Sequence, residues 1–296
     1  MDAIYRTVTS LFLSLLSAIG IQAAPMTWQM QPMPDGRSVN LLISTHPHST
    51  HGETIAIDQF DGLRALLPAD LSRAESGGGP AKFRLKRDAG VFEFDGVLRR
   101  GAGGGTLEFV PSETFANELA KRGFGKPTPA EQFKMAWHDT GFALIDELAA
   151  QKYQRPPLAR LIDAGVHAID RAYVRELASV GYQLGTVDGL IRQHDHGVSA
   201  DYIRSLASLG LARLSADDLV RARDHGIGPE YVRDMRAVGY TLTLEELVRA
   251  RDHGISAPWT SRVNSRNGKL SFEQLVSLRD HGVETLGELR RRTHAS

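Results

Sequence analysis

The spacing of apolar side chains divides the chain into two differently patterned regions. From Met26 to about Val110, apolar and polar residues alternate with a period of two, which is typical of β-strands. From about Pro111 onward, the apolar residues follow the period of short helices. The pattern predicts an α+β chain, with a small antiparallel β domain over 25–110 followed by an α-helical repeat domain over 111–296.

Four or five strands are expected in the β domain. The segment 101–105, which is mostly glycine, lies between the last two strands and predicts a hairpin turn. Phe83 and Leu85 share one face of their strand, as do Phe92 and Phe94 of theirs. One side of the sheet therefore needs a cover, and the first helices of the repeat domain are the nearest candidate. The clearest strands are expected at 39–45, 54–57, 82–87, 91–99 and 106–110.

The helical region repeats one short motif. The tripeptide Asp-His-Gly recurs four times, and its glycines are 29, 28 and 28 residues apart. Such a period is typical of stacked helical units. Each unit is predicted to contain two short helices separated by glycine. A capping-box sequence such as Thr243 to Glu246 begins the first helix, and the glycine of the motif ends it. We expect an α-solenoid of short two-helix repeats with a period of about 28–29 residues. The motif residues are Asp195, His196, Gly197, Asp224, His225, Gly226, Asp252, His253, Gly254, Asp280, His281 and Gly282.

Weaker copies extend the array toward the N-terminus. Asp139-Thr-Gly141 and Asp163-Ala-Gly165 resemble degenerate versions of the motif, and the helix expected over 112–122 matches the second helix of later units. The array is therefore expected to begin near Pro111 and to contain about six units. The segment 129–153 has few helix-breaking residues, so we expect it to form a longer helical stretch than the units that follow.

The repeated polar residues have a structural interpretation and a functional one. Histidine in the last turn of a helix is favoured by the helix dipole, whereas aspartate there is not. We therefore expect each aspartate to pair with an arginine or a backbone N–H of the neighbouring unit. A single metal shared along the series is disfavoured, since equivalent positions on packed helices lie about 8–10 Å apart. A pH-sensing role for the histidines stays open, and the series Tyr173, Tyr202, Tyr231 and Trp259 is interpreted as packing.

Residues 1–24 predict a cleaved secretory signal peptide. An apolar run over about 11–21 follows Arg6 and ends before small residues, and it is too short to span a bilayer. The chain has no cysteine, which excludes disulfides and a lipoprotein anchor. A periplasmic or secreted protein without stable membrane insertion is expected. Lysine plus arginine equals aspartate plus glutamate at 35 each, so no bulk charge attracts nucleic acid.

Enzyme signatures are missing from the sequence. It contains no HExxH, no Gly-x-Ser-x-Gly and no phosphate-binding or dinucleotide-binding glycine loop. No catalytic residue and no cofactor is therefore predicted. The histidines His46, His48 and His51 form the better metal candidate, because they lie in one short polar segment.

The repeat sequence resembles that of a known group of proteins. The run from His-Gly-Ile through Pro229-Glu-Tyr-Val-Arg to Gly239-Tyr240 is similar to helical repeats of uncharacterised bacterial exported proteins. Similar repeats are appended to some membrane-bound metallopeptidases of the beta-lactam-sensor type, whose peptidase helix has no counterpart here. The resemblance implies a module of the bacterial cell envelope.

Three functions are compatible with this sequence. The first is an exported, non-enzymatic repeat scaffold that binds a protein or peptide. The second is a ligand- or metal-responsive envelope sensor that uses the His46–His51 segment. The third is a hydrolase with an unrecognised site between the two domains. Architecture favours the first, although an architecture alone does not specify a role.

Overall fold

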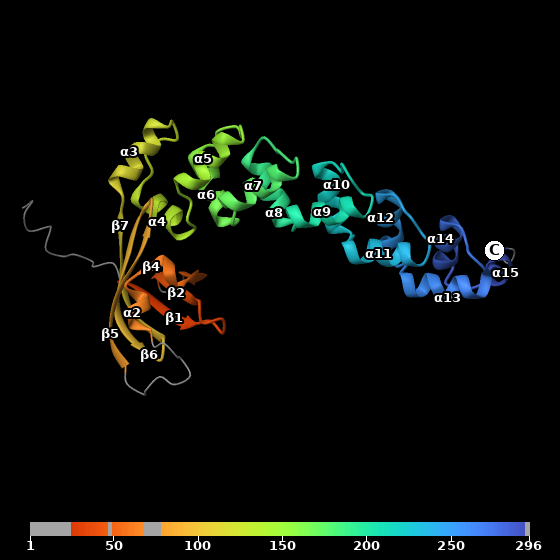
Figure 1. Ribbon diagram of the computed structural model, residues 1–296, viewed down its shortest axis with the longest axis horizontal. Coiled ribbons are helices and arrows are strands. Elements are labelled where there is room, and N and C mark those ends of the chain that lie inside the picture. The colour runs from red at the N-terminus through yellow and green to blue at the C-terminus, as the bar shows by residue number, and fades with distance from the viewer. Residues whose placement is uncertain (1–24, 47–48, 68–77, 294–296) are drawn as a thin grey trace, which may run out of the picture. The chain divides into compact units, whose positions relative to one another are not determined.

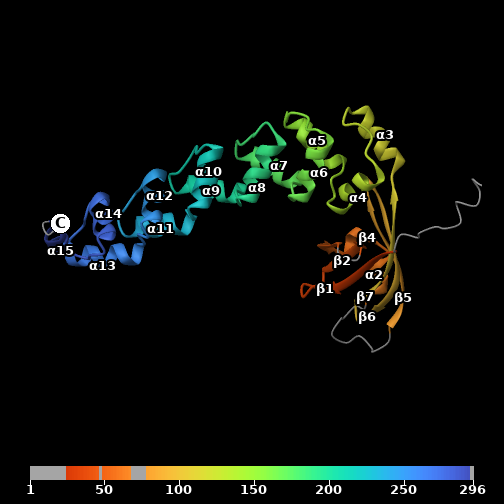
Figure 2. The same cartoon turned by 180° about the vertical axis from the view of Figure 1, so that it is seen from behind.

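The computed structural model describes residues 25–46, 49–67 and 78–293 and confirms the α+β class (Figures 1 and 2). The chain divides into two compact units after Phe115. The first contains an antiparallel sheet and the second contains helices. The expected signal peptide over 1–24 lies outside the described residues.

A single seven-stranded antiparallel sheet forms the first unit, in the order β3-β2-β1-β7-β6-β5-β4. A short 3-10 turn and the one-turn helix α2 lie between β3 and β5 in the sequence. Five of the strands follow the predicted alternation, whereas β1 and the two-residue β4 were not identified separately. The elements are β1 (Met26–Pro32), β2 (Ser38–His46), β3 (Ser49–Ala56), η1 (Ile57–Gln59), β4 (Phe60–Asp61), α2 (Leu63–Leu66), β5 (Gly78–Arg87), β6 (Gly90–Arg99) and β7 (Ala102–Pro111).

The sheet curls around an aromatic core. Trp28 on β1 and Phe83 on β5 belong to strands three positions apart, which a flat sheet would separate by about 14 Å. Their ring centroids lie 5.2 Å apart, and Phe83 stacks on Phe94 at 4.7 Å. Leu63 of α2 is fully buried as well. Within the first unit, the curl of the sheet and α2 thus supply the cover that we expected from the first helices of the repeat region.

The prediction of a turn over 101–105 is wrong for most of that segment. The turn itself is at Arg100 and Gly101, whose φ angles are 51° and 79°. Gly103, Gly104 and Gly105 belong to β7, where a Cβ on Gly103 or Gly105 would meet β6 and a Cβ on Gly104 would meet β1. A Cβ on Gly105 would lie 2.0 Å from the carbonyl oxygen of Asp95. The glycines therefore permit a close approach of two strands, which is the other common use of glycine in a sheet.

Thirteen helices follow the sheet in the described residues, and most of them are nine residues long. They succeed one another in sequence order in Figure 1. Their bounds are α3 (Glu113–Lys121), α4 (Pro129–Trp137), α5 (Phe142–Ala150), α6 (Leu158–Val166), α7 (Arg171–Ser179), α8 (Val187–Asp195), α9 (Ala200–Ser208), α10 (Ala216–Asp224), α11 (Pro229–Ala237), α12 (Leu244–Asp252), α13 (Ala257–Asn267), α14 (Phe272–Asp280) and α15 (Leu286–Thr293).

Each even-numbered helix from α8 to α14 ends in the same way. The histidine of the motif is the C-cap, and the glycine after it has a positive φ of 61° to 71°. In the α10 copy, Gly226 N–H donates to the Arg223 carbonyl and Ile227 N–H donates to the Ala222 carbonyl, which is the Schellman pattern. Capping boxes open α4, α10, α12 and α14.

The two early copies were aligned incorrectly. Gly141 is the N-cap of α5, and Gly165 lies inside α6. The left-handed position after the C-cap is taken by Asp139 with φ 51° and by Ala168 with φ 55°. The C-cap histidines of these copies are His138 and His167. The expected longer helix over 129–153 is likewise two nine-residue helices, because the left-handed residue ends α4.

Helices of the second unit pack on their next-but-one neighbours. One series of contacts joins the even-numbered helices, α4 to α6, α6 to α8, α8 to α10 and α10 to α12. The other joins the odd-numbered helices, α5 to α7, α7 to α9, α9 to α11 and α11 to α13. Each helix from α4 to α11 therefore packs on its counterpart in the following copy of the motif.

Candidate functional site

The repeated aspartates pair with the histidines of the preceding copy. The Nδ1 to Oδ1 distances are 2.9 Å for His167 and Asp195, 2.5 Å for His196 and Asp224, and 2.7 Å for His225 and Asp252. The pair of His253 and Asp280 continues the series. Since an ionised carboxylate only accepts, Nδ1 carries the proton in this arrangement. We call these four pairs the His–Asp ladder.

The ladder identifies a partner that we did not expect. The aspartate was expected to meet an arginine or a backbone N–H of the neighbouring unit, and it meets a histidine. The C-cap histidines recur at 138, 167, 196, 225, 253 and 281, a series longer than that of the glycines. Aligning the copies on histidine instead of glycine reveals this longer series in the sequence. His281, at the end of the series, bonds the carbonyl of Ser277 in its own helix at 2.9 Å.

Tyrosines of the odd-numbered helices also bond to the next copy. The hydroxyl groups of Tyr202 and Tyr231 donate to the carbonyls of Ile227 and Ile255 at 2.7 and 2.9 Å. Tyr173 does the same to Val198 at 2.9 Å. Burial raises the pKa of both Tyr202 and Tyr231 to about 12. These rings are therefore structural contacts between copies.

In three of the four copies an arginine directly precedes Asp-His-Gly, and its guanidinium group covers an aromatic ring of the preceding odd-numbered helix. The guanidinium carbon of Arg223 lies 3.7 Å from the ring centroid of Tyr202, and that of Arg251 lies 4.2 Å from the centroid of Tyr231. Arg279 lies 5.4 Å from the ring of Trp259. Such cation–π contacts contribute about 0.5–1 kcal/mol at exposed sites. The polar residues of the motif thus contact adjacent copies of the motif and do not converge on one cavity.

A further row of ion pairs joins successive even-numbered helices. Arg221 of α10 contacts Glu245 of α12 at 2.7 Å, and Arg249 of α12 contacts Glu273 of α14 at 2.6 Å. Arg160 with Asp188 and Arg192 with Asp217 are the corresponding pairs of earlier copies. Hydrogen bonding to Arg221 lowers the pKa of Glu245. Each of these pairs is exposed, so it contributes little singly and mainly favours one alignment of neighbouring copies.

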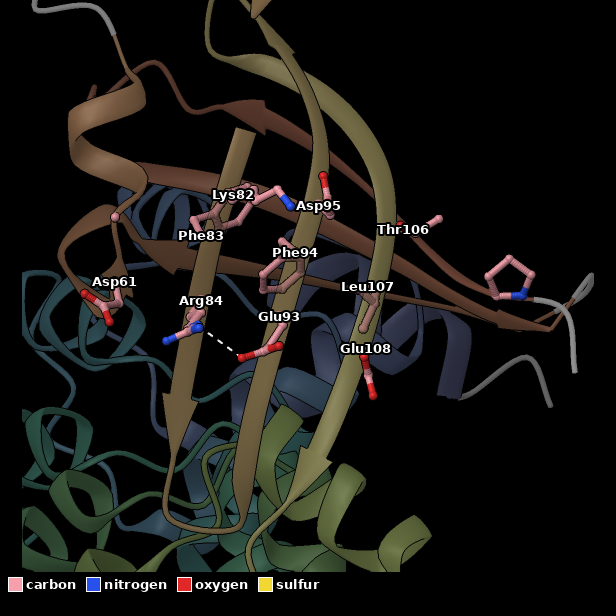
Figure 3. A pocket seen from close by; sticks show the side chains of 12 residues that line it. Asp61, Lys82, Phe83, Arg84, Glu93, Phe94, Asp95, Thr106, Leu107 and Glu108 are labelled. Carbon is pink, nitrogen blue, oxygen red and sulfur yellow. Dashed lines mark ion pairs between the residues drawn. The ribbon is translucent and has the colours of Figure 1, made fainter. Parts of the chain in front are cut away.

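A hollow of about 780 Å³ lies on the polar face of the sheet (Figure 3). Its charged side chains come from adjacent strands and pair with each other: Lys82 lies 2.9 Å from Asp95, and Arg84 lies 3.1 Å from Glu93. Hydrogen bonding to Asp95 raises the pKa of Lys82. Strand β5 contributes the bases Lys82 and Arg84, whereas β6 and β7 contribute the acids Glu93, Asp95 and Glu108. Both bases are paired, so the lining has no free cation for an anionic ligand. The residues that line the hollow include no histidine and no serine.

Of the histidine segment, His46 is the last residue of β2, and Ser49, Thr50 and His51 begin β3. His46 pairs with Ser49 in the strand register, after an irregularity between Ser44 and His46. His51 Nε2 lies 3.2 Å from the hydroxyl of Ser49. His48 and the side chain of His46 lie outside the described residues. Among the described residues, no three histidine, aspartate or glutamate side chains are placed to hold a metal ion.

Comparison with protein-family models, with curated proteins and with solved structures finds no match to this chain. In the part of the chain that the structure describes, no helix combines the length and the apolar character needed to cross a membrane.

Proposed function

We propose that the second unit is an α-solenoid of two-helix repeats that binds a protein or peptide, and that the chain is an exported, non-enzymatic component of the bacterial cell envelope. The contacts between copies carry the proposal. The His–Asp ladder, the tyrosine hydroxyls and the arginine–carboxylate row all join one copy to the next at intervals of about one repeat. Arrays stabilised mainly between neighbours present extended surfaces, which such proteins use for binding.

The solvent-facing side of the odd-numbered helices repeats as well. Arg175, Arg204 and Arg233 occupy the same position in α7, α9 and α11, at intervals of 29 residues, and all three are exposed. Arg204 donates to Ser179 of α7 at 3.1 Å and pairs with Asp201 at 2.6 Å, and Arg175 lies 3.7 Å from Glu147. We call these three residues the arginine row. A row of equal charges at regular spacing is suited to an extended acidic or polar segment of a partner.

Export is supported by the sequence features at the N-terminus, together with the resemblance of the repeats to those of exported bacterial proteins. A fusion of residues 1–30 to a reporter that is active only outside the cytoplasm tests this part. Reporter activity above that of a fusion beginning at residue 25 is expected, and equal activities would contradict export.

Partner capture tests the binding function. The full chain would be immobilised and exposed to a periplasmic extract, with cross-linking and mass spectrometry to map the contact. We expect a recovered partner to cross-link on α7, α9 or α11 and to be lost from the double variant Arg204→Glu/Arg233→Glu. The control is Arg99→Glu, an equal charge reversal on an exposed residue of β6. Recovery of nothing above background, or equal loss in the control, would contradict the proposal.

A further inference from the structure

An apolar pocket of about 290 Å³ lies within the second unit, between the end of α3 and α5. Its walls include Phe124, Ile145, Leu148 and Tyr153, and Pro156 closes one side. Ile145, Leu148 and Tyr153 are buried. The volume is at the lower limit for small-molecule pockets and is appropriate for a single apolar side chain.

The rim of the pocket carries two arginines with different surroundings. Arg122 is neutralised, because it lies 3.1 Å from Glu118 and 2.5 Å from Asp146. Arg155 uses one nitrogen to donate to the carbonyl of Arg122 at 3.1 Å. Within the described residues, no carboxylate is paired with Arg155, and its side chain is exposed. The rim therefore presents one uncompensated cation directly beside an apolar cavity.

The residue at the position of Arg155 varies along the array. Gln154-Arg155 recurs 29 residues later as Gln183-Leu184, and a further 29 residues on the position is Arg213. The copy with Leu184 shows that the packing of the array does not require an arginine at every copy.

The loop that carries Arg155 is held in place. Gln154 N–H donates to the Gly185 carbonyl at 2.8 Å, and the hydroxyl of Tyr153 accepts from the Leu184 N–H at 3.3 Å. Pro156 and Pro157 follow directly and fix the backbone before α6. A rim fixed in this way loses little conformational freedom when a ligand binds.

We propose that this pocket binds the C-terminal residue of a peptide, with an apolar side chain in the cavity and the terminal carboxylate on Arg155. In a C-terminal residue, the side chain and the terminal carboxylate are attached to the same Cα. The side chain can therefore fill the cavity while the carboxylate reaches Arg155 at its edge. Guanidinium groups bind carboxylates through paired, charge-assisted hydrogen bonds. The inference rests on the proposed peptide-binding function and specifies one partner chemistry for it.

Fluorescence polarisation with the full chain tests the inference. The probe is a fluorescein-labelled hexapeptide, Gly-Ser-Gly-Ser-Ala-Phe, with a free carboxyl terminus. We expect saturable binding that weakens about tenfold or more when the terminus is amidated, as for loss of a charge-assisted hydrogen bond. A peptide ending in serine should also bind more weakly. Equal binding of acid and amide, or no binding of the phenylalanine peptide, would overturn the proposal.

Two variants separate the cation from the cavity. Arg155→Gln should lose the preference for the free acid, and Ala149→Trp should block the cavity from an exposed position on α5. Arg213→Gln, an exposed arginine in the loop after α9, is the matched control and should bind normally. Circular dichroism verifies that each variant is folded. Competition by a long-chain fatty acid in place of the peptide would instead assign the site to lipid carboxylates and overturn the peptide proposal.

The outcomes are distinguishable from those of the capture experiment. If a partner is captured through the arginine row but the peptide does not bind, the binding function stands and this pocket is excluded as its site. If the peptide binds and no partner is captured, the peptide site in the pocket is supported and partner binding by the arginine row is contradicted.

Discussion

At the scale of single residues, the repeated motif combines several weak contacts at one helix end. His225 donates to Asp252 of the next copy, Arg251 covers Tyr231, and Arg251 also donates to the Gly226 carbonyl at 2.9 Å. Apart from the buried ring of Tyr231, the participating side chains are half-exposed or exposed, so each contact is worth about 1 kcal/mol or less. Their regular recurrence aligns each copy with the next.

A double-mutant cycle on the His–Asp ladder tests this view. His225→Ala and Asp252→Ala should show a coupling energy of about 0.5–1 kcal/mol, because the pair is partly exposed. Urea unfolding of the four proteins in the cycle measures it. The matched control combines His225→Ala with Asp280→Ala, whose aspartate belongs to the next pair along the ladder. A coupling as large in the control would mean that the contact is not pairwise.

Each tyrosine hydroxyl should contribute more to the free energy of unfolding than a pair of the His–Asp ladder does. Tyr202→Phe leaves the buried carbonyl of Ile227 without its donor, so we expect a loss of about 1–2 kcal/mol in the free energy of unfolding. Leu209→Ala, at a half-buried residue just after the same helix, controls for general perturbation of the region. A loss below about 0.3 kcal/mol would indicate that water replaces the hydroxyl.

The same tyrosines predict an alkaline limit of stability. The pKa of Tyr202 and of Tyr231 is raised to about 12, above the usual value of about 10. A raised pKa in the folded state gives stability that is complete below about pH 10 and is lost as the pH rises toward 12. Absorbance of tyrosinate near 295 nm, recorded together with circular dichroism, should show these tyrosines ionising only as helices unfold. Ionisation at pH 10 without loss of helix would contradict their burial.

Backbone conformation decides the cost of changing Gly226. Its φ is +67°, a region that asparagine tolerates and a β-branched residue does not. Gly226→Val should therefore destabilise the chain by about 1–2 kcal/mol more than Gly226→Asn. Gly228→Ala is the control, since Gly228 has φ −84° and nothing within 4 Å of a Cβ. Equal melting temperatures for the valine and asparagine variants would mean that the C′ assignment is wrong.

At the scale of elements, strands and helices differed in how well the sequence predicted them. Alternation located β2, β5 and β6 because each has one face in the core. The glycines of β7 were misassigned, since glycine is equally consistent with a turn and with a close strand approach. The division between α4 and α5 was missed because the left-handed residue is Asp139 and not a glycine.

The candidate sites were predictable only in part. The motif itself was visible, but the histidine partner of each aspartate depends on the rise between copies, which a sequence pattern does not give. The pocket beside α5 is formed by residues of α5 and its flanking loops, and the repeat pattern does not distinguish it, because the position of Arg155 is leucine in the next copy and arginine again at Arg213. The curl of the sheet brings Trp28 against Phe83 and Phe94, and a pattern of alternation does not specify contacts between strands that are not neighbours.

A glycine substitution tests the close approach of β6 and β7. Gly105→Ala places a Cβ 2.0 Å from the Asp95 carbonyl oxygen and 2.6 Å from the Cα of Gly96, so β6 and β7 must separate. We expect a loss of about 1–3 kcal/mol, as for overpacking in a core. Gly79→Ala is the control on β5, where a Cβ meets nothing within 4 Å. Denaturation followed by tryptophan fluorescence, to which the buried Trp28 contributes, provides the measurement. Equal stabilities would show that the strands accommodate the methyl group.

At the scale of the whole molecule, the proposed solenoid predicts that stability is distributed between neighbouring copies. A chain ending at Gly239 loses α12 to α15 but retains the contacts among α4 to α11, so its remaining helices and its sheet should stay folded. A chain ending at Val220 cuts α10 in half and removes both Arg223 and the Ile227 carbonyl from Tyr202. That chain should lose α9 as well as α10. Circular dichroism per residue compares the two truncations with the full chain. Complete loss of helix after the Gly239 cut would contradict a nearest-neighbour array, and equal behaviour of both truncations would show that the tyrosine contacts do not define its units.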